Sequence, residues 1–205
     1  MPRNIEIKAR IDSVQALAPR VAKIANEGPT EIFQDDTFFQ CAAGRLKLRA
    51  FSERHGELIF YRRSNQAGPK ESFYVRSPTA EPASLRDALT LAYGEAGRVR
   101  KHRTLYLVGR TRVHLDTVEG LGHYLELEVV LSEGESSQAG VELAHRLMEQ
   151  LGVEPAQLME GAYVELLAEK IPDHADSDSR KEPGPGHRLS LERSATIPQS
   201  KSRAS

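Results

Sequence analysis

Polar and apolar residues alternate at the start of the chain. Asn4, Glu6 and Lys8 occupy every second position, and Ile5 and Ile7 stand between them. In a β-strand, alternate side chains share a face, so the pattern predicts a strand with one polar and one apolar face. The same alternation recurs later in the chain, at 44–49, 110–116 and 125–129.

Runs of apolar and β-branched residues between turn residues predict further strands. They cover residues 32–40, 45–52, 58–63, 72–76, 99–108, 110–118 and 123–131, with a loop at 64–69. Helical spacing of apolar residues predicts four helices. The first begins after Ser13 and ends near Gly28, the second begins at Ser84 and ends at Gly94 or Gly97, and the last two cover 141–151 and 163–167.

These elements indicate an α+β fold. Each amphipathic helix needs an apolar surface, and the apolar faces of the predicted strands provide one. A consistent arrangement places the helices outside a curved or closed antiparallel sheet. Its interior would then be charged and wet, whereas the lumen of an ordinary small barrel is filled with aliphatic side chains.

The charges of the predicted strands are segregated by sign. One strand carries only cations, Arg45, Lys47 and Arg49, and another carries two carboxylates, Glu126 and Glu128. Any single strand of this kind is better explained by the wet face of an antiparallel sheet. Because like charges repel unless opposite charge, metal or an anion is nearby, the segregation as a whole favours a site that holds both cations and anions.

Composition narrows the class of protein. A chain of 205 residues with a net charge of -1 suits one soluble domain and does not suit a generally basic nucleic-acid binder. Cys41 is the only cysteine, so neither an intrachain disulfide nor a cysteine-based zinc cluster can form. No apolar run has the length of a membrane span and the N-terminus has no signal-peptide core, so the cytoplasm is the expected compartment.

The last part of the chain differs from the rest. Residues 172–205 are rich in Asp, Ser, Arg, Pro and Gly and have almost no large apolar side chains. Such a segment buries too little surface to offset its ordering entropy. The sequence therefore predicts one folded domain at 1–171 and a disordered tail at 172–205.

Carboxylates beside several cations fit a particular ligand. Mg²⁺ prefers hard oxygen ligands and bridges phosphate oxygens, while Lys and Arg balance the remaining phosphate charge. The pattern therefore indicates a site for a metal-bound triphosphate.

At this point the chain resembles the CYTH superfamily of triphosphate tunnel enzymes, over residues 3 to 170. The resemblance rests on ordered motifs: an N-terminal strand with Glu6 and Lys8, then Lys47/Arg49, Lys101/Arg103, Asp116, and Glu126/Glu128. Within that superfamily it is most similar to the class IV adenylate cyclase branch. The resemblance implies a closed eight-stranded antiparallel β tunnel with amphipathic helices outside, and it leaves a homodimer open.

The resemblance also assigns roles by position. It implies Mg²⁺ or Mn²⁺ as cofactor, held by Glu6, Asp116, Glu126 and Glu128. It implies that the triphosphate is bound by Lys8, Lys47, Arg49, Lys101 and Arg103, with Arg63 and Arg112 as further candidates for which structural ion pairing is an equal alternative. The residues expected to act in catalysis are Lys8, Glu126 and Glu128.

The chain departs from the family at Asn4, where the family usually has a glutamate. An amide oxygen can ligate Mg²⁺, but it carries no charge and cannot act as a base. The substitution predicts a lost or weakened second metal.

The sequence does not decide between several functions. A cyclase would convert ATP to cyclic AMP and pyrophosphate, a hydrolase would cleave inorganic tripolyphosphate or thiamine triphosphate, and a non-catalytic module would only bind polyphosphate. RNA 5′-triphosphate recognition is disfavoured because no extended basic surface is present.

No sequence feature marks a pocket for a nucleotide base. The aromatic residues at strand positions are interpreted as packing elements, with stacking on a base as the alternative: Phe38, Phe39, Tyr61, Tyr74 and Tyr124. His102, His114 and His123 are interpreted as surface or hydrogen-bonded residues, since a hard-oxygen Mg²⁺ site does not require imidazole.

Overall fold

The structure is a computed structural model that describes residues 3–170. The predicted disordered tail at 172–205 lies outside the described residues. Within the described part, no helix has both the length and the apolarity that crossing a membrane requires.

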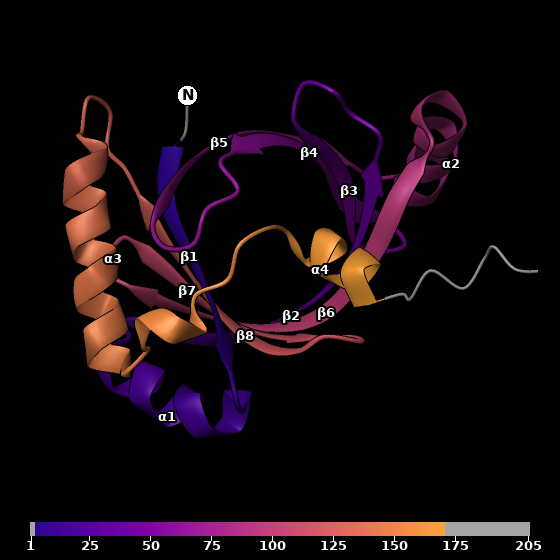
Figure 1. The fold of residues 1–205 in the computed structure, drawn as a ribbon. Helices are drawn as coiled ribbons and strands as arrows, with labels where there is room; N and C mark the ends of the chain where they lie inside the picture. Colours follow the sequence, from indigo (N-terminus) through magenta and orange to yellow (C-terminus); the bar gives the residue numbers. More distant parts are fainter. Residues whose placement is uncertain (1–2, 171–205) are drawn as a thin grey trace, which may run out of the picture. The chain divides into compact units, whose positions relative to one another are not determined.

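Eight antiparallel strands form a closed ring (Figure 1). Their bounds are β1 Arg3–Ile11, β2 Glu27–Phe39, β3 Arg45–Ser52, β4 His55–Arg63, β5 Lys70–Thr79, β6 Glu95–Val108, β7 Thr111–Val118 and β8 Gly122–Val130. The neighbour order is β1-β5-β4-β3-β2-β6-β7-β8, and β8 pairs back onto β1. The predicted closed eight-stranded antiparallel tunnel is therefore confirmed.

Four helices and one short 3-10 helix accompany the ring. They are α1 Val14–Ile24, α2 Pro82–Tyr93, α3 Ser137–Leu151, η1 Pro155–Gln157 and α4 Tyr163–Lys170. Figure 1 shows α1 and α3 along the outside of the strands, and α2 packs against β2, β3 and β4. The prediction of helices outside the sheet is confirmed for these three.

The main hydrophobic core lies between the ring and the helices α1 and α3. The outward side chains Ile7, Val113 and Leu127 are fully buried there, together with Val21 of α1 and Leu147 of α3. Burial of each such side chain stabilises the fold by about 1.5–3 kcal/mol. Because the apolar faces of β1, β7 and β8 point outward to this core, the alternate polar residues point inward.

The predicted bounds of all four helices are shifted by a few residues: α3 begins at Ser137 and not at 141, and α4 ends at Lys170 and not at 167. The helix α1 ends at Ile24 and not at Gly28, because Gly28 belongs to β2, with a φ of 108° that favours glycine. A Cβ at this position would lie 2.7 Å from the carbonyl oxygen of Leu105 on the neighbouring strand. The helix α2 begins at Pro82 and not at Ser84, since proline suits the first turn of a helix.

The segment that contains α4 lies at one end of the ring (Figure 1). The backbone N–H of Met159 donates to the carbonyl oxygen of Lys8, and the first residue of α4, Tyr163, packs in a buried cluster with Phe38, Val99 and Tyr124. The interior is therefore apolar at the end near α4 and charged beyond it.

Candidate active site

A charged cavity occupies the interior of the ring. Its volume is about 290 Å³, and residues from all eight strands line it, together with Ala162 and Tyr163. Eight of the lining residues are Lys or Arg and five are Asp or Glu. The inward-facing charges that the alternation predicted therefore do converge, with an excess of cations.

One pair of cations is held by an aspartate. The β2–β3 register places Asp36 opposite Arg49 and next to Lys47. Lys47 Nζ donates to Asp36 Oδ2 at 2.8 Å, and Arg49 donates to Oδ1 and Oδ2 at 2.7 Å each. Burial alone would raise the pKa of Asp36, but Arg49 and Lys47 lower it far below its usual value. Asp36 is therefore a fixed anion that orients both predicted phosphate-binding residues.

The surroundings of Lys47 disfavour its charged form. Burial and the neighbouring Arg49 lower the pKa of Lys47 to about 8, although Asp36 opposes this effect. At pH 7 its ammonium group is still mostly charged.

A second pair of cations has the same arrangement. Lys101 Nζ donates to Asp116 Oδ2 at 2.9 Å, Arg103 donates to both oxygens of Asp116 at 2.6 Å, and the hydroxyl of Tyr163 donates to Oδ2 at 3.1 Å. Asp116 is completely buried, and these donors engage both of its oxygens. It acts as the counter-ion of Lys101 and Arg103, and its role as a metal ligand stays a prediction.

Glu126 lies among three cations. Arg103 donates to Oε2, and Lys8 Nζ lies 3.5 Å from Oε1. Burial alone would raise the pKa of Glu126, but Lys101, Arg103 and Lys8 lower it well below its usual range. The carboxylate is therefore ionised at neutral pH without any bound metal.

Lys8 is 1% exposed and lies against the segment that leads into α4. Its Nζ donates to the carbonyl oxygen of Gly161 at 3.0 Å and lies 3.9 Å from the centre of the Tyr163 ring. Burial lowers the pKa of Lys8 to about 8, and Glu126 only partly opposes this effect. Sequence analysis alone gave no sign that the segment at 161–163 helps to position Lys8.

Arg63 and Arg112, for which triphosphate binding and structural ion pairing were equal alternatives, both line the cavity. Arg63 pairs with Glu6 and donates to the carbonyl oxygen of Gly161 at 2.8 Å, and Arg112 Nε donates to Glu128 Oε2 at 2.8 Å. Structural ion pairing and a position in the candidate site therefore coexist in both residues.

His114 is the residue that sequence analysis interpreted wrongly. His102 is on the surface and His123 lies in hydrogen-bond distance of Thr117, as predicted, but His114 is 4% exposed and lines the cavity. Its Nδ1 has no hydrogen-bond partner. The signal was present in the alternation of Arg112, His114 and Asp116, which placed all three on one face.

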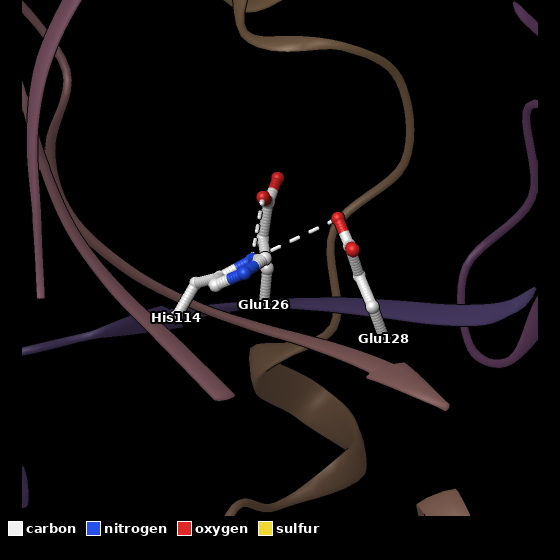
Figure 2. Close-up of side chains that lie close together, drawn as sticks. All are labelled: His114, Glu126 and Glu128. Atoms are coloured by element: carbon white, nitrogen blue, oxygen red, sulfur yellow. Dashed lines mark ion pairs between the residues drawn. The ribbon is translucent and has the colours of Figure 1, made fainter. Parts of the chain in front are cut away.

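His114, Glu126 and Glu128 form the group of described residues that could hold a metal ion (Figure 2). His114 Nδ1 lies 3.9 Å from Glu126 Oε2 and 3.7 Å from Glu128 Oε1. Burial and Arg103 lower the pKa of His114 to about 3. Burial opposes the ionisation of Glu128, but Arg112 and Arg103 hold the pKa of that carboxyl below its usual value. A neutral imidazole and two carboxylates are the protonation states that metal binding requires, so this donor set fits a divalent ion.

The structure also shows where Asn4 and the aromatic residues of the predicted strands lie. Asn4 is 3% exposed on the cavity wall, and its Oδ1 has no hydrogen-bond partner. Phe38, Tyr61 and Tyr74 line the cavity, whereas Phe39 and Tyr124 are buried. Lys47 Nζ lies 5.4 Å from the ring centre of Phe38 and 5.6 Å from that of Tyr61, so these rings also contact the candidate phosphate-binding cations.

A closed antiparallel ring with a polar, cation-rich interior defines a small class of tunnel proteins, because most small barrels fill their interior with aliphatic side chains. The chain belongs to the CYTH domain family, whose sequence model matches residues 2–163.

Two curated relatives match most of the chain. A protein of Methanocaldococcus jannaschii named "Putative adenylate cyclase" is 23% identical over 175 residues, which cover 80% of this chain and 97% of the relative. The adenylate cyclase CyaB of Aeromonas hydrophila is 24% identical over 183 residues, which cover 82% and 94%. The similarity therefore extends over nearly the full length of both relatives.

Solved structures share the fold. The PH1012 protein of Pyrococcus horikoshii matches with a TM-score of 0.72 at 19% identity, over 80% of this chain and 99% of that one. The protein HpAC1 of Hippeastrum, described as a "putative adenylyl cyclase" with a dominant triphosphatase activity, matches with a TM-score of 0.59 at 15% identity, over 82% and 96%. At these identities the likeness shows the tunnel fold.

Proposed function

We propose that this protein is a divalent-metal-dependent enzyme that acts on a triphosphate inside the tunnel. The favoured reaction is that of a class IV adenylate cyclase, in which ATP gives cyclic AMP and pyrophosphate. The names of the two curated relatives support this choice of reaction.

The excess of cations in the cavity is the observation that carries the proposal. Eight Lys or Arg and five Asp or Glu line a volume of about 290 Å³, and counting Asp116, the buried counter-ion of Lys101 and Arg103, still leaves two more cations than carboxylates. Fixed charges that line a cavity act more strongly on a bound ligand than charges in bulk water do. A triphosphate is a compact polyanion, so it complements this charge.

The two aspartate-held cation pairs are the candidate phosphate-binding elements. Asp36 orients Lys47 and Arg49, and Asp116 orients Lys101 and Arg103, through bonds of 2.6–2.9 Å. Donors that are already oriented need little reorganisation when charge develops on phosphate oxygens. In the proposed reaction they bind the β- and γ-phosphates and stabilise the departing pyrophosphate.

The carboxylates are proposed to hold the cofactor. Glu126 and Glu128, with Glu6 beside them in the β1–β8 register, would hold Mg²⁺ or Mn²⁺. When bound, such an ion neutralises phosphate charge and lowers the pKa of a coordinated hydroxyl or water. The low pKa values of Glu126 and Glu128 make these carboxylates poor proton acceptors at neutral pH, so they are assigned to binding and not to base catalysis.

Hydrolysis of a compact triphosphate is the second candidate function. A cavity of about 290 Å³ is at the lower end of the size range of small-molecule sites, about 300–1,000 Å³, and it would hold a tripolyphosphate chain more readily than a complete nucleotide. The likeness to the Hippeastrum protein, with its described triphosphatase activity, also supports this candidate. Tripolyphosphate and thiamine triphosphate are the substrates to test.

A product assay distinguishes the candidates. Purified full-length protein is incubated with Mg²⁺ or Mn²⁺ and with ATP, tripolyphosphate or thiamine triphosphate, and cyclic AMP, pyrophosphate and orthophosphate are quantified. Cyclic AMP with equimolar pyrophosphate supports the cyclase, and orthophosphate supports the hydrolase. Tight binding of all three compounds without any product would leave only a polyphosphate-binding module.

A further inference from the structure

We propose that His114 is a nitrogen ligand of the divalent ion that Glu126 and Glu128 bind, and that this ligand makes the site favour Mn²⁺, Co²⁺ or Zn²⁺ over Mg²⁺. The inference deepens the metal-binding part of the proposed function and rests on it. It favours Mn²⁺ over Mg²⁺, the two ions that the family resemblance implied, and it adds a nitrogen ligand to a site for which the sequence motifs indicated only hard oxygen ligands.

The first argument is the register of two neighbouring strands. His114 of β7 stands opposite Glu126 of β8, and Glu128 follows two residues later on the same face. The three ligand atoms lie within 4.8 Å of one another (Figure 2). Ligand atoms around an ion with bonds of about 2.1 Å are separated by about 3.0–3.5 Å. The observed separations of 3.9 and 3.7 Å need only small side-chain movements to reach that range.

The second argument is the unpartnered nitrogen. His114 Nδ1 is buried and has no hydrogen-bond partner, and both glutamate oxygens lie beyond hydrogen-bond distance from it. Buried polar atoms normally have a partner, so an atom without one indicates a missing ligand, ion or water. Its position between two carboxylates, which would share a divalent ion with it, favours the ion.

The third argument excludes a role for His114 as a counter-ion. Arg103 donates to Glu126, and Arg112 donates to Glu128, so each carboxylate already has a cationic partner. An imidazole with hydrogen on Nε2 instead presents a lone pair on Nδ1 to the space between the carboxylates.

The chemistry of the donor set gives the preference between metals. Imidazole nitrogen binds transition ions and zinc well, whereas Mg²⁺ strongly prefers oxygen. The wall also carries Asn4 in place of a family glutamate, so one hard anionic oxygen is missing from the same cavity. Both changes reduce the advantage of Mg²⁺ at this site.

The test measures metal binding in the absence of any triphosphate. Full-length wild-type protein, His114→Asn and the control His102→Asn are titrated calorimetrically with Co²⁺ and Mg²⁺, and circular dichroism confirms that each variant is folded. His102 is the matched control, because it lies on the neighbouring strand β6 with a 56% exposed side chain on the outside of the ring. We expect His114→Asn to weaken Co²⁺ binding by at least about tenfold, with a much smaller change for Mg²⁺, and His102→Asn to change neither.

A spectroscopic measurement on the unaltered protein supplies a second readout. Pulsed electron paramagnetic resonance of the Mn²⁺-loaded protein should show coupling to a directly bound ¹⁴N nucleus, and His114→Asn should lose that coupling. Wild-type protein without nitrogen coupling, equal Co²⁺ affinities of wild type and His114→Asn, or no divalent-ion binding at all would overturn the inference.

The test of His114 as a metal ligand and the test of the proposed function can fail independently of each other. A protein that shows nitrogen coupling but converts no triphosphate retains the metal site and loses the enzyme assignment. A protein that converts a triphosphate but shows no nitrogen coupling retains the enzyme assignment and loses His114 as a ligand.

Discussion

Replacing Asp36 by asparagine tests whether the interior charges are held as an organised set. The side chain accepts three charge-assisted hydrogen bonds of 2.7–2.8 Å, from Lys47 and Arg49, and is almost completely buried. Removing one partner of a buried ion pair commonly costs 3–5 kcal/mol, because the remaining charge is left uncompensated. Here two cations would lose their counter-ion at once.

The cavity moderates that cost. The side chains of Lys47 and Arg49 are 14% and 13% exposed, so cavity water can solvate the freed cations in part. We therefore expect Asp36→Asn to lower the free energy of unfolding by about 2–3 kcal/mol, which corresponds to a fall in Tm of about 4–12 °C for a domain of this size. Thermal and urea unfolding of the full chain provide the measurement.

The neighbouring residue supplies a matched control. Asp35 points out of the ring, where it pairs with Arg98 at 2.6 and 2.7 Å and lies 3.8–3.9 Å from Arg100 and Arg86. Since these arginines are 22–46% exposed and water screens their charge, Asp35→Asn should cost less than Asp36→Asn, about 1 kcal/mol. Added tripolyphosphate should also raise the Tm of Asp36→Asn more than that of wild type, because the freed cations gain a new anion. Equal stabilities of the two variants, or equal stabilisation by tripolyphosphate, would refute the assignment of Asp36 as the internal counter-ion.

Three further predictions concern the metal and the triphosphate. Glu128→Gln should reduce metal-dependent turnover by at least about 100-fold with an unchanged circular dichroism spectrum, and an unchanged rate would remove Glu128 from the site. Asn4→Glu should tighten divalent-ion binding at least about tenfold in calorimetry, because it adds a carboxylate to the cavity wall; unaltered affinity would place Asn4 away from the ion. The affinity of wild type for tripolyphosphate should fall as the pH rises through about 8, where folded Lys47 and Lys8 lose their charge, and the affinity of Lys47→Arg should fall less steeply because a guanidinium stays protonated and only Lys8 then titrates. Parallel pH profiles of the two proteins would show that Lys47 does not contact the anion.

The alternation along individual strands was sufficient to predict which face of each strand is charged. Ile5 and Ile7 contact the outer core, so Glu6 and Lys8 must face the interior. Because side chains repeat every second residue, this assignment follows from the sequence once a strand is recognised. The alternation left open whether the sheet is curved or closed, and the closed eight-stranded ring was implied by the family resemblance.

The partner of each charge could not be predicted in the same way. Asp36 belongs to a strand that the sequence placed correctly, but its role depends on the β2–β3 register, which sets it between Lys47 and Arg49. His114 was visible on the polar face of its strand, yet its isolation from hydrogen-bond partners is a property of the folded cavity. Such contacts depend on pairing between distant segments, which periodicity does not encode.

The most direct test of the charged tunnel as a metal and triphosphate site is a crystal structure of the protein with Mn²⁺ and a non-hydrolysable triphosphate. We predict an anomalous Mn²⁺ peak in contact with Glu126 and Glu128, and phosphates in contact with the cation pairs Lys47/Arg49 and Lys101/Arg103. A cavity without either ligand at saturating concentrations, with manganese or triphosphate on the outer surface, would contradict the account.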